Sequence, residues 1–261
     1  MTSANYPPED KWFYEGEKYN NLKPPIAVAS VIYKFIKLEY FLSILKANKL
    51  RVEKISSWED PFENILFKCN CRNAQGERVS LANLQQSLYG QSFTNLAESD
   101  ALWRIYSSQK DCIRLSMTAG GLFDALYGDG HANFERTSLF IAEVNYSDEN
   151  EIIALLSDEE MPRREIFSQE PNKFIFLKRK AFEHEKEVRL VFQLACNHKF
   201  YGQPRLEFDI DPNMLFSEVL LDPRLDADEV QKIELSLRNN GYRNGVSQSK
   251  LYGSRTFDIK I

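Results

Sequence analysis

The sequence has 261 residues, of which 43% are hydrophobic, so it can fill the core of one large domain or two small ones. Its formal net charge of −5 excludes a general attraction to nucleic acids or anionic membranes, so any contact with a polyanion needs a local basic patch. No run approaches the roughly 20 apolar residues of a membrane span, and the N-terminal segment has neither the basic start nor the apolar run of a signal peptide. Four scattered cysteines favour a reducing, cytoplasmic location over a disulfide framework.

The pattern predicts an irregular N-terminal arm over residues 1–26 and a single α+β domain over residues 27–261. Strands and helices mix without strict alternation, which argues against a doubly wound parallel sheet. In chain order, strands are expected at 27–36, 51–55, 91–94, 112–117, 138–146, 185–194, 205–211, 217–222 and 255–261. Helices are expected at 38–50, 81–88, 97–108, 121–128, 147–165, 172–182 and 227–237.

The densest charged segment is LKRKAFEHEKEVR, residues 177–189. If Glu185 begins a strand, the period of two places Glu185, Glu187 and Arg189 on one face, with the two carboxylates about 7 Å apart. Two such carboxylates repel unless a cation or a substrate lies between them, which is typical of a site. The alternative is a solvated strand start in which Arg189 pairs with a glutamate.

A second segment, SFTNLAESDALWRIYSS, places the hydroxyls of Ser92 and Thr94 at a strand end, before a helix with Ser99 as its N-cap. Trp103 and Tyr106 lie on one face of that helix and form either aromatic core or a ring wall for a flat ligand. A third segment, WEDPFEN, is either a capped turn or the rim of a pocket that carries Asp60 or Glu63.

No metal site is expected. Cys69 and Cys71 have no second Cys or His pair at zinc-ligand spacing, and the sequence contains only His131, His184 and His198.

The order of these segments resembles a bacterial family of unknown function, numbered 2971. Its pattern comprises a Tyr-Lys-Tyr strand, an Asn-Asp-Pro-Phe-Glu turn, a Cys-Phe-Ser strand, a Trp-x-x-Tyr helix and a Glu-x-Glu-x-Arg strand. YKF, DPFE, SFT, LWRIYS and EKEVR stand in that order over about residues 30–195. The sequence departs from the family at Glu59, Thr94 and Phe182, and Lys110 and Asp111 fill a stretch where the family often has glycine.

The element order is also similar to the ADP-ribosyltransferase plan, which implies a split sheet, NAD as the substrate and no metal. By this resemblance Glu187 is the catalytic carboxylate and Glu185 orients the acceptor. The resemblance assigns NAD binding to Tyr33, Lys34, Ser92, Thr94, Tyr106 and Arg189. It also suggests a toxin of antiphage defence that modifies a macromolecular acceptor and meets an antitoxin or defence partner.

Two other functions stay open at this stage. One is a non-catalytic sensor or interaction domain on the same scaffold. The other is a metal-independent RNA nuclease that uses Lys178, Glu185, Glu187 and Arg189, although no histidine is well placed for it.

Overall fold

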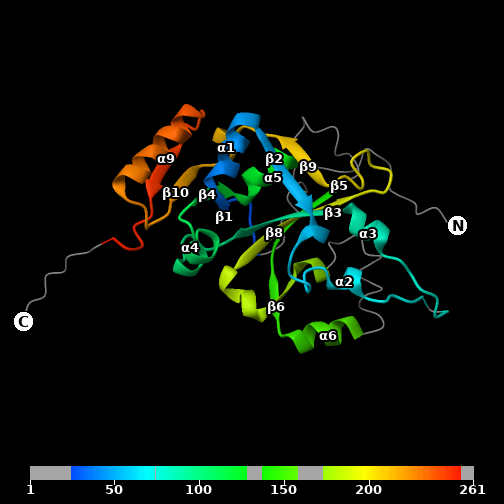
Figure 1. The fold of residues 1–261 in the computed structure, drawn as a ribbon. Helices are drawn as coiled ribbons and strands as arrows, with labels where there is room; N and C mark the ends of the chain where they lie inside the picture. The colour runs from blue at the N-terminus through cyan, green and yellow to red at the C-terminus, as the bar shows by residue number, and fades with distance from the viewer. Residues whose placement is uncertain (1–24, 74, 128–136, 158–172, 254–261) are drawn as a thin grey trace, which may run out of the picture.

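The computed structural model describes residues 25–73, 75–127, 137–157 and 173–253, and a mostly antiparallel sheet forms its centre (Figure 1). Hydrogen-bonded neighbours follow the order β11-β10-β4-β1-β3-β2-β9, and β8 pairs with β3 and carries β5 beyond it. The strands are β1 (Val31–Lys37), β2 (Lys49–Lys54), β3 (Leu88–Thr94), β4 (Cys112–Thr118), β5 (Thr137–Glu143), β8 (Glu187–Leu194), β9 (Arg205–Asp209), β10 (Glu218–Leu221) and β11 (Gly245–Gln248). The predicted α+β class with a mixed, mainly antiparallel sheet and flanking helices is confirmed.

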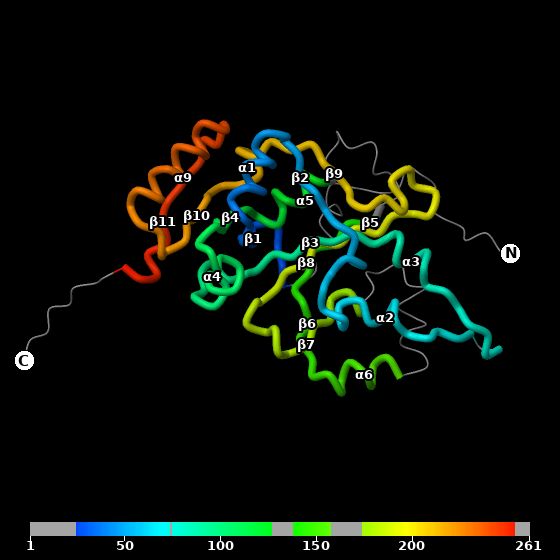
Figure 2. The backbone as a smooth tube through the Cα atoms, in the orientation of Figure 1, coloured from blue at the N-terminus to red at the C-terminus, as the bar shows by residue number. Residues whose placement is uncertain are grey.

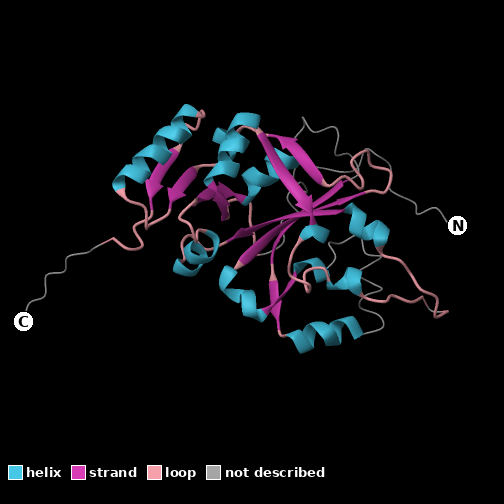
Figure 3. Ribbon diagram, in the orientation of Figure 1, coloured by secondary structure: helices cyan, strands magenta, loops and turns pink. Residues whose placement is uncertain are grey.

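Helices flank this sheet, and a small parallel sheet of β6 (Asn145–Ser147) and β7 (Leu177–Arg179) lies apart from it (Figure 3). The helices are α1 (Leu38–Ala47), α2 (Ile65–Lys68), α3 (Ala82–Ser87), α4 (Asp100–Tyr106), α5 (Ala119–Tyr127), α6 (Glu149–Ser157), α8 (Pro212–Leu215) and α9 (Ala227–Asn239). Three short 3-10 helices are η2 (Ile55–Ser57), η4 (Lys173–Phe176) and η5 (Lys180–Glu185). Within the described ranges, no helix has the length and apolar character to cross a membrane.

The large sheet splits along one edge of β3. Tyr89 and Gly90, at the start of β3, pair with β2, whereas Thr94 at its end pairs with Tyr33 of β1. On the opposite edge β8 pairs with β3 from Leu88 to Thr94. Since β1 and β2 contact the same edge at its two ends, they diverge around the middle of β3.

Side chains bridge this split. Lys34 Nζ donates to the main-chain carbonyl of Ser92 over 3.0 Å, and Gln91 Nε2 donates to the carbonyl of Arg51 over 3.4 Å. A β3 carbonyl and a β2 carbonyl that the diverging strands leave open thus each find a side-chain donor, as main-chain polar groups generally must.

One face of the sheet carries the main hydrophobic core. Alternate residues of each strand point to this face, among them Ile32, Phe93, Leu115 and Val188. Helices α1, α5, α8 and α9 cover it with apolar side chains. The predicted inner face of the last helix is confirmed, because Leu237 is buried and Val230 and Ile233 pack against the core.

The predicted N-cap of α4 is also confirmed. Ser99 has an extended backbone, and its hydroxyl accepts from the Leu102 N–H. Leu102 and Trp103 are buried as predicted for the inner face, but Tyr106 is 44% exposed. Tyr106 lies three residues after Trp103, at the end of α4, where its side chain is partly accessible.

The predicted helix over residues 172–182 is wrong. Those residues form η4, the strand β7 and the start of η5 instead. The apolar run KFIF is too short to distinguish a helix from other structure, and β7 forms because it pairs with β6, a contact remote in the sequence.

The predicted strand start at Glu185 is wrong as well. Glu185 ends η5, Lys186 takes the left-handed conformation with φ 43°, and β8 begins at Glu187. The expected strand over 138–146 divides into β5 and β6, and the sequence pattern does not predict β11. The expected strand over 255–261 and the proposed arm before residue 25 lie outside the described residues, so the domain boundary at residue 26 stays a prediction.

Lys110, in the turn before β4, has a backbone conformation that is unusual for lysine. It takes φ 57°, in the left-handed region that glycine enters at no steric cost. The turn before β4 therefore keeps a glycine-like backbone with a lysine side chain.

Candidate functional site

The face of the sheet opposite the main core carries a row of polar residues. Direct Cα partners cross neighbouring strands from Glu187 on β8 to Thr94 on β3, Tyr33 on β1, Ser116 on β4 and Glu218 on β10. Because partners in register share a face, the sequence-predicted residues from three distant segments lie side by side.

Glu187 is the centre of a hydrogen-bonded cluster and is only 2% exposed. Its Oε1 accepts from the Ser92 hydroxyl and, over 2.8 Å, from Arg189 Nε. Its Oε2 accepts from Lys178 Nζ over 2.9 Å and from Arg189 Nη2 over 3.1 Å. Burial opposes ionisation, but Arg189, Lys178 and Ser92 outweigh it and hold the pKa of Glu187 at about 2. The carboxylate is therefore ionised at any physiological pH.

Lys178 joins three carboxylates. Its Nζ lies 2.7 Å from Glu185 Oε2, 2.9 Å from Glu187 Oε2 and 3.1 Å from Glu63 Oε1. Burial disfavours the ammonium, yet these neighbours raise the pKa of Lys178. Glu185 thus reaches the same cation as Glu187 although it precedes the strand, because the left-handed Lys186 redirects the chain between them.

Arg189 is fully buried and holds the Glu187 carboxylate through two hydrogen bonds. Besides Glu187, it donates to Glu63 Oε1 and to the carbonyls of Ile175 and Leu177. Its guanidinium also lies 4.6 Å from the centre of the Trp58 ring, a cation–π contact. Arg189 is 0% exposed and holds Glu187 in this structure, and its predicted contact with NAD stays a prediction.

Gly90 makes room for Trp58 on this face. A Cβ at Gly90 would lie 2.7 Å from Trp58 Cζ2, so a larger residue would displace the ring. Trp58 is half-buried and stands on the face of β3 that also bears Ser92, two residues further on.

Ser92 is the accessible member of the cluster. It is exposed, it lies at the split of the sheet, and its hydroxyl bonds to Glu187. Thr94 is buried instead, and its hydroxyl donates to the Glu185 carbonyl over 2.6 Å. Thr94 thus ties the end of β3 to the turn at Lys186, and its predicted contact with NAD stays a prediction.

Lys34 reaches the split from the other side of the sheet. Its ammonium donates to the Ser92 carbonyl and lies 5.1 Å from the centre of the Phe93 ring, which belongs to the core face. Burial lowers the pKa of Lys34 to about 8, although Glu187 opposes the shift.

The two tyrosines predicted to bind NAD both lie on the polar face. Tyr33 is half-buried and stacks under Arg114, whose guanidinium lies 4.5 Å from the ring centre. Tyr106 stacks on Phe35 with ring centres 6.0 Å apart. Burial and the nearby Glu185 raise the pKa of Tyr106, so its phenol stays protonated.

Three partners of the cluster came from weaker sequence signals. The sequence pattern does not indicate Trp58, gives Glu63 only as one of two candidates in WEDPFEN, and places Tyr146 only at the end of an expected strand. The Tyr146 hydroxyl accepts from the Glu187 N–H over 2.8 Å, and burial raises the pKa of Tyr146 to about 12. Asp60, the other candidate, bonds instead to Arg179 over 3.1 Å.

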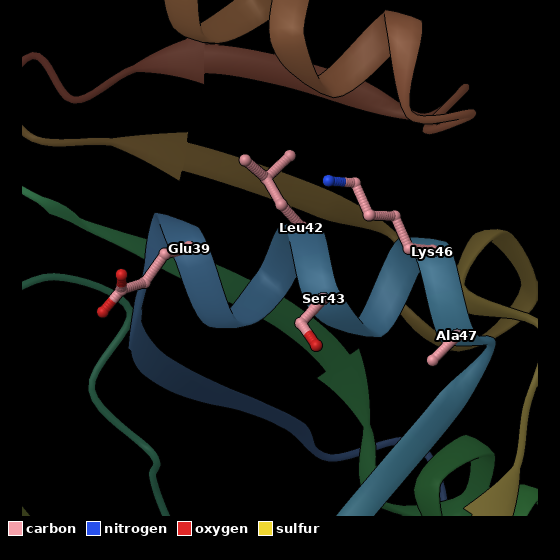
Figure 4. A pocket seen from close by; sticks show the side chains of 5 residues that line it. All are labelled: Glu39, Leu42, Ser43, Lys46 and Ala47. Atoms are coloured by element: carbon pink, nitrogen blue, oxygen red, sulfur yellow. The ribbon is translucent and has the colours of Figure 1, made fainter.

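Metal-ligand residues do not gather elsewhere in the described part of the chain. No group of three or more His, Cys, Asp or Glu side chains there could hold an ion, and the four cysteines are free thiols. A shallow hollow does occur on α1, lined by Glu39, Leu42, Ser43, Lys46 and Ala47 (Figure 4). Because α1 covers the core face, this hollow lies across the sheet from Glu187.

Comparison with known proteins finds low similarity. No protein-family model and no curated protein matches the sequence. The structure of DarT from Thermus sp. 2.9 in complex with NAD+ is 14% identical, covers 86% of this chain and 98% of its own, and has a TM-score of 0.38. DarT in complex with ADP-ribosylated ssDNA is 13% identical, covers 88% and 98%, and has a TM-score of 0.39. The functional argument therefore rests on this chain's own side chains.

Proposed function

We propose that the chain is an NAD-dependent ADP-ribosyltransferase or a related NAD-consuming enzyme. The observation that carries the proposal is the ionised Glu187, which bonds to the exposed Ser92 where the sheet splits. Cleavage of the nicotinamide–ribose bond passes through a state with positive charge on the ribose. A fixed carboxylate beside the ribose stabilises that charge, which is the electrostatic contribution that usually matters most.

The charge of the whole cluster agrees with this chemistry. Glu63, Glu185 and Glu187 face two cations, Lys178 and Arg189, so one negative charge remains when all are ionised. A surplus negative charge in a buried, poorly solvated place attracts a cation strongly.

Each residue then has a role that its surroundings suit. Glu187 stabilises the developing cation, Ser92 contacts the ribose, and Lys34 holds the Ser92 main chain at the split. Tyr33 and Tyr106 line the nicotinamide side. Glu185 bonds to Lys178 and also has Tyr106 as a hydrogen-bonding neighbour, so it lies beside the ring assigned to the nicotinamide side, where it would orient an acceptor.

A non-catalytic interaction domain is the second candidate, and one observation favours it. All four hydrogen-bonding positions of Glu187 are occupied by side chains of the chain itself. A buried ion pair with a purely structural role also needs all of its hydrogen-bonding positions filled, so this observation fits a domain without catalysis. The RNA nuclease has no comparable support, since its four side chains bond to one another.

The wider role follows from the resemblance of the sequence and is proposed on that basis. The chain is then a toxin of antiphage defence with a macromolecular acceptor and a neutralising partner. Expression of wild type should arrest growth of a bacterial host, whereas expression of Glu187→Gln at the same level should not. Equal growth with both would contradict the toxin role.

Incubation of the purified chain with NAD tests the enzyme. Free nicotinamide should appear, and labelled ADP-ribose should pass to one of three supplied acceptors: protein, RNA or single-stranded DNA. Glu185→Gln should lower transfer more than hydrolysis to free ADP-ribose. No release of nicotinamide from folded wild type in the presence of these acceptors would favour the interaction domain.

A further inference from the structure

Residues 68–73 and 75–80, here called the basic hairpin, are joined by hydrogen bonds to one another, and most of them are exposed. The two sides of the hairpin pair at Arg72 and Arg78, and the Val79 N–H donates to the Cys71 carbonyl over 2.8 Å. At the turn, the Asn73 side chain accepts from the Glu77 N–H, and Gly76 takes φ 80°. Nearly all its described residues are exposed, so these hydrogen bonds shape a projection rather than support the core.

The hairpin leaves the body of the molecule between α2 and α3 (Figure 2). Its first residue, Lys68, ends α2 and stands five residues after Glu63, and Glu63 and Trp58 contact Arg189 of the candidate site. The projection is therefore joined to the site by a short stretch of chain.

Its charge is unusual for this acidic protein. The described residues of the hairpin include Lys68, Arg72 and Arg78 against the single acid Glu77, so the net charge is +2. The Glu77 carboxylate accepts from the Asn73 amide, and neither arginine forms an ion pair with a carboxylate of a described residue.

Arg72 and Arg78 are direct cross-strand partners, an arrangement in which like charges destabilise a hairpin. Their guanidiniums point apart, because Arg72 donates to the Gly76 carbonyl near the turn and Arg78 donates to Asn70 near the base. Each guanidinium has five N–H donors, and these bonds use one apiece. The hairpin thus keeps two cationic donor groups spaced along its length.

We propose that the basic hairpin binds the phosphate backbone of a nucleic acid. Arginine recognises phosphate through paired donors, and a chain with negative overall charge needs a local patch of this kind to hold a polyanion. A protein surface intersperses both signs of charge, whereas a nucleic acid presents an anion at each nucleotide and no cation. A nucleic acid therefore suits the two guanidiniums better, because neither of them pairs with a carboxylate of a described residue. In the context of the proposed function, the hairpin would hold the acceptor.

Binding of a fluorescently labelled single-stranded oligonucleotide, followed by anisotropy over a range of salt concentrations, tests the proposal. The variant Arg72→Gln/Arg78→Gln should bind about 10-fold more weakly, and the slope of log K against log salt should fall by about 1.4 in magnitude. The control Lys46→Gln/Lys232→Gln removes the same charge from exposed positions on α1 and α9 and should bind as wild type does. Melting temperatures establish that all three proteins are folded.

Three results would overturn the proposal: no binding of the oligonucleotide to wild type, an equal loss in the control, or equally tight binding of a polyglutamate peptide. The measurement contains no NAD, so it does not depend on the proposed enzyme. Release of nicotinamide without acceptor should be unchanged in Arg72→Gln/Arg78→Gln, and binding without NAD cleavage in wild type would reject the enzyme while the hairpin proposal stands.

Discussion

The two faces of the central sheet are built from the same strands but are stabilised by different interactions. On the core face, Ile32, Phe93, Leu115 and Val188 meet apolar helices, and any well-packed apolar partner serves. On the polar face, Glu187 needs specific donors at hydrogen-bonding distance, because a buried charge without a partner is strongly destabilising. The core face therefore tolerates substitution, whereas the polar face depends on a few particular side chains.

The largest effect should come from Arg189→Met, which removes one of the two cations, Arg189 and Lys178, that Glu187 and Glu63 share. We expect a loss of about 3–5 kcal/mol in the free energy of unfolding, measured by denaturant titration. The double variant Glu187→Gln/Arg189→Met should regain at least half of that loss, since it removes the stranded charge. If the single and double variants are equally unstable, Arg189 stabilises by packing, and the distinction between the two faces fails.

A smaller effect should appear on acidification. The folded-state pKa of Glu187 lies below its ordinary value of 4.5, at about 2, so its contribution is complete above pH 4.5 and is lost as the pH falls towards 2. The shift corresponds to about 3 kcal/mol. Glu63 acts in the opposite direction, because burial raises its pKa. Unfolding of wild type and Glu187→Gln should therefore be followed over this range.

The difference in stability between these two proteins should shrink as the pH drops from 4.5 to 2. A difference that is independent of pH would mean that Glu187 does not contribute as a charge.

The smallest expected change in the free energy of unfolding concerns Lys186, in the turn that brings Glu185 to Lys178. Lys186→Gly should raise the free energy of unfolding by at most about 1 kcal/mol, because glycine accepts the left-handed conformation without strain. Lys186→Val should lower it, since a β-branched residue disfavours positive φ. Thermal melts of both variants check the order, and a more stable valine variant would contradict the role given to this turn.

The sequence predicts the core face better than the polar face, for a physical reason. Alternation within a strand and the Ser99 cap are local, so they can be recognised in a single segment. Glu63 and Tyr146 join the Glu187 cluster through contacts remote in the sequence, and nothing in their own segments indicates their partners.

The local sequence pattern also explains why Glu185 is predicted on the same strand face as Glu187 but is not found there. Period-two alternation assumes that the strand continues, but Lys186 is left-handed, and lysine gives no sign of that conformation. Glu185 and Glu187 still converge on Lys178, although not on one strand face.

The most direct test of the account measures NAD cleavage and NAD affinity together in wild type and Glu187→Gln, with folding verified for both. The account predicts that kcat for nicotinamide release falls by about 10²–10³, because the charge acts on the transition state, while the Kd for NAD changes little. Equal kcat in the two folded proteins would contradict the claim that the Glu187 cluster is the catalytic centre.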